Sequence, residues 1–283
     1  MNTIHVPTHA RRMLLLFFLV VFGTLLAGCD TFLQEDDAVE IPTRVSIDQQ
    51  AFQTAVVFTL NAPPSGFESV AFPEISDNLI TTVYSSVDIN VFFDGHYSDT
   101  QEPVEAGYMR VQIWNDELHV ARHVRIEFLG DVFSGGSSNL DVVRLSNDYY
   151  MVDTSGRCIT DPATVSEIAN LRPGQLIGGV EFAQPSGRKE VINGVQAWQY
   201  GFDPQFINPP AVELSNGTAD LDFLTGELWV DPEHNVVVRY AVELNVHRAK
   251  LLFGDREVTG RLRYQYDVFD IGVQPQISLP RGC

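Results

Sequence analysis

The chain has 283 residues and carries 18 Lys and Arg against 37 Asp and Glu, a formal net charge of −19. A surface this acidic repels phosphate backbones, which excludes nucleic acid as an expected partner, and it also repels anionic lipid head groups. The length allows one large β domain or two smaller domains. We expect a single domain over residues 46–283, acting as a monomer.

The first predicted element is a short apolar segment at the N-terminus. Arg11 and Arg12 precede an apolar run over Met13–Leu26, and no acidic residue occurs before Asp30. The run is shorter than the about 20 apolar residues that a membrane span needs. A basic start, a short apolar core and small residues at the exit are the anatomy of a secretory signal peptide, which we place at residues 1–28.

The exit sequence Leu26-Ala27-Gly28-Cys29 resembles the bacterial lipobox. In that motif the cysteine receives a diacylglyceryl group and becomes the new N-terminus. The resemblance implies a lipoprotein anchored through Cys29, since two or three acyl chains such as palmitate give stable anchoring. The expected location is the cell membrane, on the side facing outside the cytoplasm. The alternative is an ordinary signal peptide followed by an incidental cysteine.

An acidic stretch follows the expected lipid-attachment site. Removing residues 1–28 leaves 18 − 2 = 16 basic residues against 37 acidic ones, a net charge of −21. The segment Gln34–Arg44 contains four acids, one proline and few large apolar residues, a composition typical of a linker. We interpret residues 29–45 as a tether between the lipid and the domain.

The start of the domain is ambiguous between helix and strand. Ser46 and Gln49 have the spacing of a capping box, which favours a helix over Ser46–Phe58. The sequence AVVFTL at residues 55–60 is equally typical of a strand. Both alternatives remain open for this segment.

Period-two alternation of apolar and polar residues dominates the remainder of the chain. In Val236–Val246 the even-numbered residues are apolar, and in Arg261–Phe269 the even-numbered residues are again apolar or tyrosine. This pattern predicts strands with one buried face. The same alternation occurs in four shorter runs, Val87–Phe93, Tyr108–Trp114, His123–Phe128 and Gln196–Phe202.

Short turn sequences separate these predicted strands. The strongest is Asn193-Gly194, which is typical of a two-residue hairpin; the others are Asn115-Asp116, Asp231–Asn235 and Gly254-Asp255. Strands joined by short turns are antiparallel neighbours, because parallel strands need long crossovers. One polar face per strand indicates a sheet that is covered on one side.

One helix is predicted, over Asp161–Gly174. Asp161 is a suitable N-cap and Pro162 a suitable first helical residue. Val165, Ile168 and Leu171 share one face of this helix, and we expect Pro173-Gly174 to end it.

The cysteines agree with an extracytoplasmic location. With Cys29 taken by the lipid, Cys158 and Cys283 remain. An even pair in an exported protein predicts a disulfide. The alternative is a nucleophilic thiol at Cys158, beside Arg157.

Two sequence stretches resemble the LolA/LppX/LprG-like superfamily of lipid and lipoprotein carriers. They are GELWVDPEHNVVVRY (Gly226–Tyr240) and VINGVQAWQYGF (Val191–Phe202), and the resemblance extends over roughly residues 78–273. It implies a mainly β (α+β) fold, in which an incomplete antiparallel β-barrel curves over a few short helices. Phe52–Asn78 departs from the family, because it holds three prolines where the family has helix.

In that superfamily lipids or lipoprotein acyl chains occupy the apolar concavity. The resemblance therefore implies a lipid or acyl cargo here. The candidate lining consists of the apolar and tyrosine residues of the last two strands, Val236, Val238, Tyr240, Val242, Leu244, Leu262, Tyr264 and Tyr266. The alternative is that these side chains only form the core against the helices.

No catalytic site is predicted. His119 and His123 would lie about 13 Å apart on a strand, too far for one metal ion, and no nucleophile–base set, metal motif or cofactor motif is visible. We therefore expect a membrane-anchored protein that binds or carries a lipid or other hydrophobic ligand without catalysis, metal or cofactor. The alternative is a ligand-free surface sensor or protein-interaction scaffold of the same fold.

Overall fold

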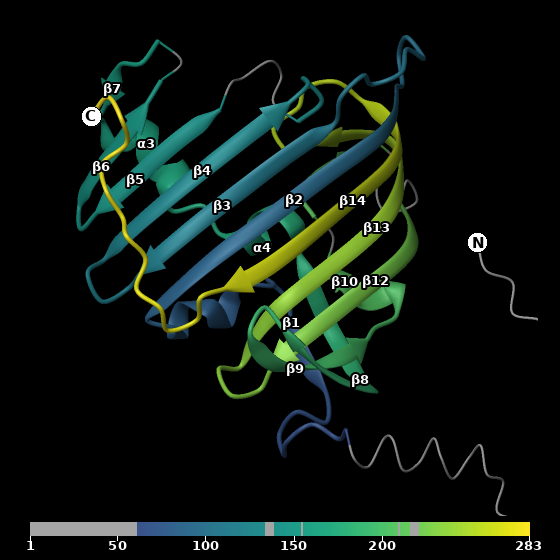
Figure 1. The fold of residues 1–283 in the computed structure, drawn as a ribbon. Coiled ribbons are helices and arrows are strands. Elements are labelled where there is room, and N and C mark those ends of the chain that lie inside the picture. Colours follow the sequence, from purple (N-terminus) through teal and green to yellow (C-terminus); the bar gives the residue numbers. More distant parts are fainter. Residues whose placement is uncertain (1–60, 134–138, 154, 209, 216–220) are drawn as a thin grey trace, which may run out of the picture. The chain divides into compact units, whose positions relative to one another are not determined.

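The computed structural model describes five stretches of the chain, residues 61–133, 139–153, 155–208, 210–215 and 221–283 (Figure 1). The first elements in the chain are β1 (Val70–Phe72), the 3-10 helix η1 (Asp77–Thr81), β2 (Tyr84–Tyr97), β3 (Tyr108–Asp116), β4 (Ala121–Leu129), β5 (Leu140–Leu145), β6 (Asp148–Val152) and β7 (Cys158–Ile159). The later elements are α3 (Pro162–Ala169), α4 (Pro173–Ile177), β8 (Gly179–Ile192), β9 (Val195–Gly201), the 3-10 helix η2 (Pro204–Phe206), β10 (Ile207–Asn208), β11 (Val212–Leu214), β12 (Leu221–Asp231), β13 (Val236–Leu251) and β14 (Val258–Phe269).

The N-terminal predictions lie outside the described residues. They are the signal peptide, the lipid site at Cys29, the tether over residues 29–45 and the helix or strand at Ser46–Phe58. Within the described stretches, no helix is long and apolar enough to cross a membrane.

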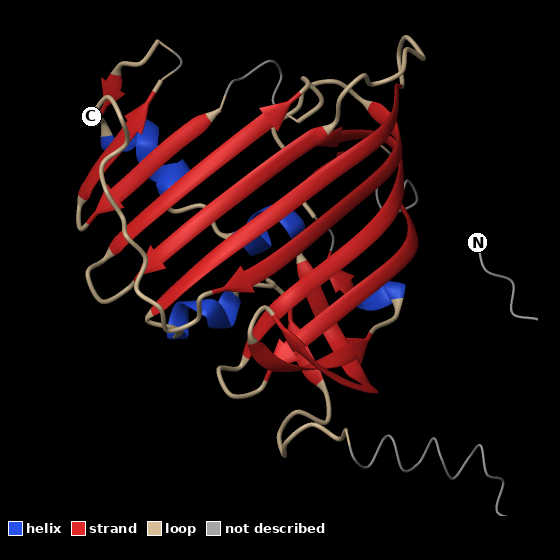
Figure 2. Ribbon diagram, viewed as in Figure 1, coloured by secondary structure: helices blue, strands red, loops and turns tan. Residues whose placement is uncertain are grey.

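The strands form one antiparallel sheet of 14 strands in the order β1-β8-β9-β12-β13-β14-β2-β3-β4-β5-β6-β7, with β10 on β8 and β11 on β13. The chain first builds β2–β7 as a meander, and its second half returns so that β14 pairs with β2 (Figure 2). In the described part of the chain β1 and β7, at the two ends of this order, do not pair. The unclosed, mainly antiparallel sheet agrees with the predicted incomplete barrel.

The alternating sequences form strands with one buried face, as predicted. Along β13 the even-numbered residues from Val236 to Val246 are buried, while most odd-numbered residues between them are partly exposed. On β14 the buried residues include Leu262, Tyr264 and Tyr266. Register places these residues on one face, because Tyr240 pairs with Tyr266. This inner face holds the main hydrophobic core.

Two predicted turns have different outcomes. Asn193 and Gly194 both have positive φ, 52° and 90°, and they form the two-residue turn between β8 and β9 as predicted. The predicted turn at Asn115-Asp116 is wrong, because β3 continues through both residues and pairs them with β4. The turn begins one residue later, where the Asp116 carboxylate accepts the backbone N–H of His119 at 3.0 Å.

The predicted helix over Asp161–Gly174 is two helices in the structure. Pro162 is at the start of α3 as expected, but α3 ends at Ala169. Pro173 was predicted to end the helix and instead begins α4. The reason is that proline is unfavourable inside a helix but suits its first turn, where its missing N–H has no intrahelical partner.

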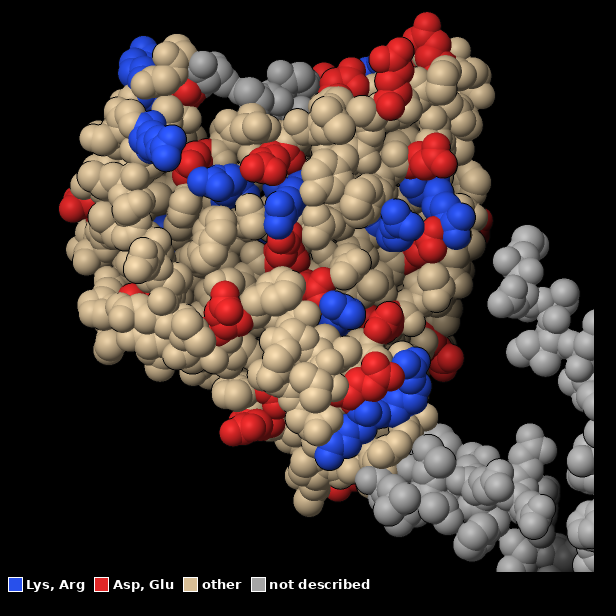
Figure 3. Space-filling model, viewed as in Figure 1, with Lys and Arg blue, Asp and Glu red and all other residues tan. Residues whose placement is uncertain are grey.

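The two α-helices of the described residues cover the inner face of the sheet. Val165 and Ala169 of α3 pack on Val142 of β5 and Met151 of β6. Leu176 and Ile177 of α4 belong to the main core. In Figure 1 both helices lie behind the strands β2–β6, whereas the chain after β14 crosses in front of these strands. The front is therefore the outer face, where acidic and basic side chains are interspersed (Figure 3).

Candidate functional site

The eight predicted lining residues lie together on the inner face of β13 and β14. Each exposes 0–3 % of its surface and belongs to the main core, Val236, Val238, Tyr240, Val242, Leu244, Leu262, Tyr264 and Tyr266. A side chain beside a space that admits water keeps some exposed area. These eight are therefore packed against protein in this structure, and a ligand there requires the inner cover to move.

The cover over this face includes two short elements, β1 and α4, next to the start of the long strand β8. Phe72 of β1 and Ile177 of α4 are both nearly fully buried in the same core. The backbone N–H of Ile75 donates to Gly178 O at 3.0 Å, which joins the segment after β1 to the end of α4. β1 has three residues and α4 has five. These two elements are therefore much shorter than the strands β13 and β14 that they cover, and β1 is held by its pairing with β8.

Three tyrosines form the centre of the site. Tyr240, Tyr264 and Tyr266 are buried to 1 % exposure or less, and the rings of Tyr240 and Tyr264 lie 6.3 Å apart. The Tyr240 hydroxyl reaches Gly179 O at 3.5 Å, a long contact. The hydroxyls of Tyr264 and Tyr266 have no protein partner within the described residues. Burial raises the pKa of all three phenols, so that all remain neutral donors at pH 7.

A row of aromatic rings joins this centre to the surface. The Phe223 and Phe202 rings are 6.1 Å apart, and Phe202 is 6.1 Å from Tyr240. Both phenylalanines are partly exposed. Gly226 makes room for this row, because a Cβ there would lie 2.4 Å from the end of the Phe202 ring. The row leads from partly exposed rings to the fully buried Tyr264.

Cys158 and Cys283 form the predicted disulfide, which joins β7 to the last residue of the chain. The alternative of a nucleophilic thiol at Cys158 does not apply, because the sulfur is bonded. Arg157 beside it pairs with Asp153 at 2.9 Å. The disulfide closes a loop of sequence separation 125 and holds the C-terminal segment against the edge of the sheet.

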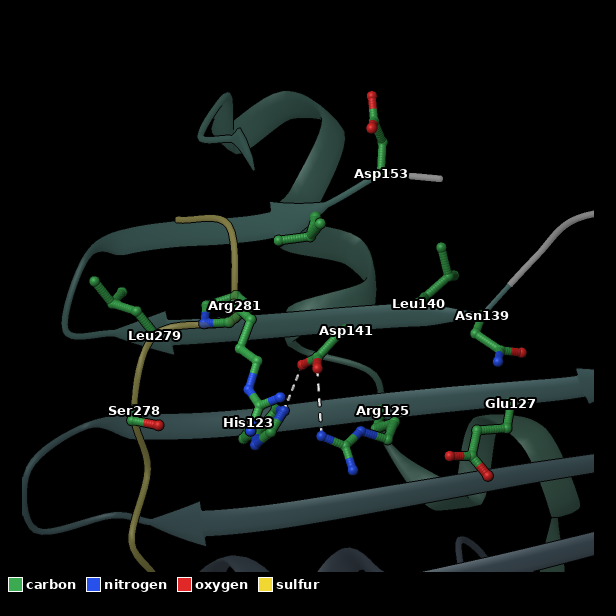
Figure 4. A pocket seen from close by; sticks show the side chains of 12 residues that line it. His123, Arg125, Glu127, Asn139, Leu140, Asp141, Asp153, Ser278, Leu279 and Arg281 are labelled. Atoms are coloured by element: carbon green, nitrogen blue, oxygen red, sulfur yellow. Dashed lines mark hydrogen bonds and ion pairs between the residues drawn. The ribbon is translucent and has the colours of Figure 1, made fainter. Parts of the chain in front are cut away.

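The C-terminal segment also forms an open groove of about 510 Å³ on the outer face, between Ser278–Arg281 and the strands β4–β6 (Figure 4). His123 and Arg125 on β4 converge on Asp141 of β5, at 2.6 and 3.3 Å. The hydrogen bond from His123 holds the pKa of Asp141 below its usual value, and the charge of Arg125 acts in the same direction.

The groove has the residue types of a Ser-His-Asp set but not its geometry. Ser278 lines the groove with His123 and Asp141. Within the described residues no hydrogen bond joins Ser278 to His123, whose Nε2 is engaged by Asp141. Activation of a serine requires a hydrogen bond to the base. This arrangement therefore gives no support to nucleophilic chemistry.

The histidines considered in the sequence do not share a site. His119 lies in the β3–β4 turn, not on a strand as predicted, and its Nδ1 contacts Asp116 at 2.8 Å, whereas His123 contacts Asp141. In the described stretches one group of three side chains could hold a metal, Asp231, Glu233 and His234, whose ligand atoms lie within 4.8 Å. Asp231 already accepts from the Glu233 N–H and pairs with His234 at 2.5 Å. These bonds close the β12–β13 turn, so we assign the group a structural role.

Sequence reasoning missed two features. The outer groove depends on the path of the C-terminal segment across the sheet, which no local pattern predicts. Arg122 and Arg144 were not singled out, although register places them opposite each other on β4 and β5. The sequence feature that identifies these two arginines is a charged residue at an inward-facing position of an alternating strand.

No family model matches the chain, and no curated protein matches it. Similar solved structures include MucB in complex with MucA(peri), with 11 % identity, 74 % of this chain and 57 % of that chain covered, and a TM-score of 0.30. Another is an uncharacterized conserved protein from Thermus thermophilus, with 9 % identity, 72 % and 85 % coverage, and a TM-score of 0.26. The chain thus spans 57 % of the MucB chain. TM-scores this low carry no functional argument, so membership of the LolA/LppX/LprG-like superfamily stays a prediction.

Proposed function

We propose that this chain is a lipid-anchored, extracytoplasmic protein that binds a hydrophobic ligand between the sheet and its inner cover, without a catalytic step. The main observation behind this proposal concerns the hydroxyls of Tyr264 and Tyr266. Both are fully buried among apolar side chains, and neither has a protein partner in the described residues. Buried donors in native proteins are nearly always satisfied. A carboxyl, ester or amide oxygen of an amphiphile supplies the acceptor they lack.

The surroundings of the tyrosines fit such a ligand. Its apolar part gains about 25 cal/mol for each Å² removed from water. The aromatic row from Phe223 to Tyr240 provides an apolar route of entry. Movement of the cover is the required step, and short elements open at lower free-energy cost than long central strands.

Two observations support the proposed location. The sequence Leu26-Ala27-Gly28-Cys29 has the order of a lipobox behind a short apolar core. The Cys158–Cys283 disulfide fits an oxidising compartment, because reducing conditions in the cytosol disfavour such bonds.

Native mass spectrometry of the exported chain tests the proposal, with lipid extraction of the same sample. We expect a reproducible adduct with the mass of an amphiphile, and rebinding of a fluorescent fatty acid to the delipidated protein. Replacing both Tyr264 and Tyr266 by phenylalanine should weaken rebinding, while Tyr200→Phe should not, because the Tyr200 hydroxyl already donates to Phe67 O. Absence of any adduct together with no rebinding would overturn the proposal.

The second candidate is an interaction scaffold that carries no ligand. It is favoured by the packing of the inner face, where the eight candidate lining residues expose at most 3 % of their surface. On this alternative the core is complete as it stands, and delipidation changes neither the stability of the protein nor its hydrogen-exchange pattern. Protection of the cover elements that increases on addition of fatty acid distinguishes ligand binding from the scaffold.

A further inference from the structure

Two arginines stand side by side on the inner face of the sheet, in the half opposite to the tyrosines. Arg122 on β4 and Arg144 on β5 are directly opposite each other in the register. Like charges in directly opposed positions are destabilising. In the described residues most other arginines pair with a carboxylate, but neither of these two does.

Both guanidinium groups have neutral partners at the end of α3. Arg122 donates to the backbone oxygen of Leu171, and Arg144 donates to the side-chain oxygen of Asn170. A helix C-terminus favours nearby cations, which explains part of this arrangement. The Nε atoms of both arginines remain buried without a partner among the described residues. Burial and the charge of Arg144 lower the pKa of Arg122 to about 10, so Arg122 still carries its charge at neutral pH.

Arg122 lines a small pocket of about 90 Å³ between η1, the β3–β4 turn and the start of α4. Arg172 lines the same pocket and brings a second guanidinium to it, while Arg144 lies beside Arg122 outside the lining. The ion pair of Arg172 with Glu74, at 3.4 Å, is at the surface. Asp77 and Glu117 also line the pocket, but both are exposed, where solvent and salt weaken their repulsion of an anion.

We propose that this pocket binds an anionic oxygen group, a carboxylate or phosphate, through Arg122, with Arg144 and Arg172 adding positive charge. A planar guanidinium with a free edge matches the two oxygens of such a group. Bound there, the anion would offset the repulsion between the opposed arginines and accept a hydrogen bond from the free edge of Arg122. The phosphate test of this site does not depend on the proposed function, because Arg122 and Arg144 lie on β4 and β5 whereas the tyrosines lie on β13 and β14.

Two sources provide this chemistry, the head group of an acidic lipid and a free phosphate or carboxylate. Isothermal titration calorimetry of the full mature chain with inorganic phosphate tests the site itself. Chloride at the same ionic strength is the control. Flotation of the chain produced without its lipid anchor, with phosphatidylglycerol vesicles against phosphatidylcholine vesicles, then separates the two sources. Binding to phosphatidylglycerol that depends on Arg122 assigns the lipid head group, and phosphate binding alone assigns a free anion.

Arg122→Gln retains a donor for the Leu171 carbonyl but removes the charge, and we expect it to weaken phosphate binding at least tenfold. Arg144→Gln should weaken it by a smaller factor, and it serves as the second variant if Arg122→Gln does not fold. The matched control is Arg110→Gln, because Arg110 is already paired with Asp88 on the outer face. Phosphate affinity that is absent in the wild type, or equal in the wild type and a folded arginine variant, overturns the proposal.

Discussion

Replacing Tyr264 by phenylalanine tests the state of the buried hydroxyls most directly. The hydroxyl is fully buried and has no partner among the described residues. A buried polar group left unsatisfied costs about 1–3 kcal/mol, and phenylalanine has the same shape without that group. We therefore expect Tyr264→Phe to raise the free energy of unfolding of the delipidated protein by about 1 kcal/mol, a rise in Tm of about 2–4 °C.

Tyr200 provides the matched control. It is buried to 1 % exposure, and its hydroxyl donates to Phe67 O at 2.8 Å. Tyr200→Phe removes a satisfied hydrogen bond and leaves the carbonyl without this donor, so we expect a loss of about 1 kcal/mol. Equilibrium unfolding in urea measures the free energy of unfolding of both variants under the same conditions. An unchanged m-value shows that the substitution did not alter the compactness of the unfolded state.

For the reasoning to stand, Tyr264→Phe and Tyr200→Phe must change the free energy of unfolding in opposite directions. If Tyr264→Phe lowers the free energy of unfolding as Tyr200→Phe does, the Tyr264 hydroxyl has a partner in the ligand-free protein. The proposed acceptor on the ligand then loses its basis. With fatty acid bound, the gain from Tyr264→Phe should shrink or reverse, because the wild-type hydroxyl is then satisfied.

Other parts of the chain allow four further tests. Cys158→Ser should lower the free energy of unfolding by about 4–5 kcal/mol in the chain-entropy treatment, and free thiols in the unreduced protein would contradict the disulfide. The pKa of Asp141 is lowered in the folded state, so its stabilisation is present above its unfolded pKa of about 3.9 and is lost as pH falls below it. Urea midpoints at pH 5 and pH 3 should therefore differ less in Asp141→Asn than in the wild type, and an equal difference refutes the assignment. Gly260→Ala should cost about 1–3 kcal/mol, because its Cβ would meet a backbone oxygen at 2.3 Å, whereas Gly201→Ala has nothing within 4 Å and should stay within about 0.5 kcal/mol. Globomycin should block processing, and the mature protein should carry a lipid mass on Cys29; a different N-terminus contradicts the lipobox.

Local patterns were sufficient for the strands and for one turn. The alternation in Val236–Val246 requires only that one face be buried, and the structure buries that face along the whole of this run in β13. Asn193-Gly194 specifies its turn because both residues accept positive φ. The disulfide followed from counting cysteines in a chain that the sequence predicts to be exported. Each of these depends on a short stretch of sequence or on composition alone.

Features that depend on which segments meet could not be predicted. The alternation of polar and apolar residues in Arg261–Phe269 indicates that β14 has one polar and one apolar face. It does not indicate that β14 pairs with β2, which lies far earlier in the chain. Asn115 and Asp116 have turn propensity, yet pairing with β4 keeps them in β3. The candidate lining residues were identified correctly as inward-facing, but their packing depends on short elements far away in sequence, such as α4.

Both proposed sites rest on the same physical argument, applied to different chemistry. An inner face packed by apolar residues tolerates polar groups only where they are satisfied. Among the described residues, Tyr264 lacks an acceptor in the half of the sheet built by β13 and β14, and Arg122 lacks an anion in the half built by β4 and β5. If both were incidental, removing either polar group would stabilise the protein without any effect on binding. A variant that gains stability and loses affinity together marks the group as part of a binding site.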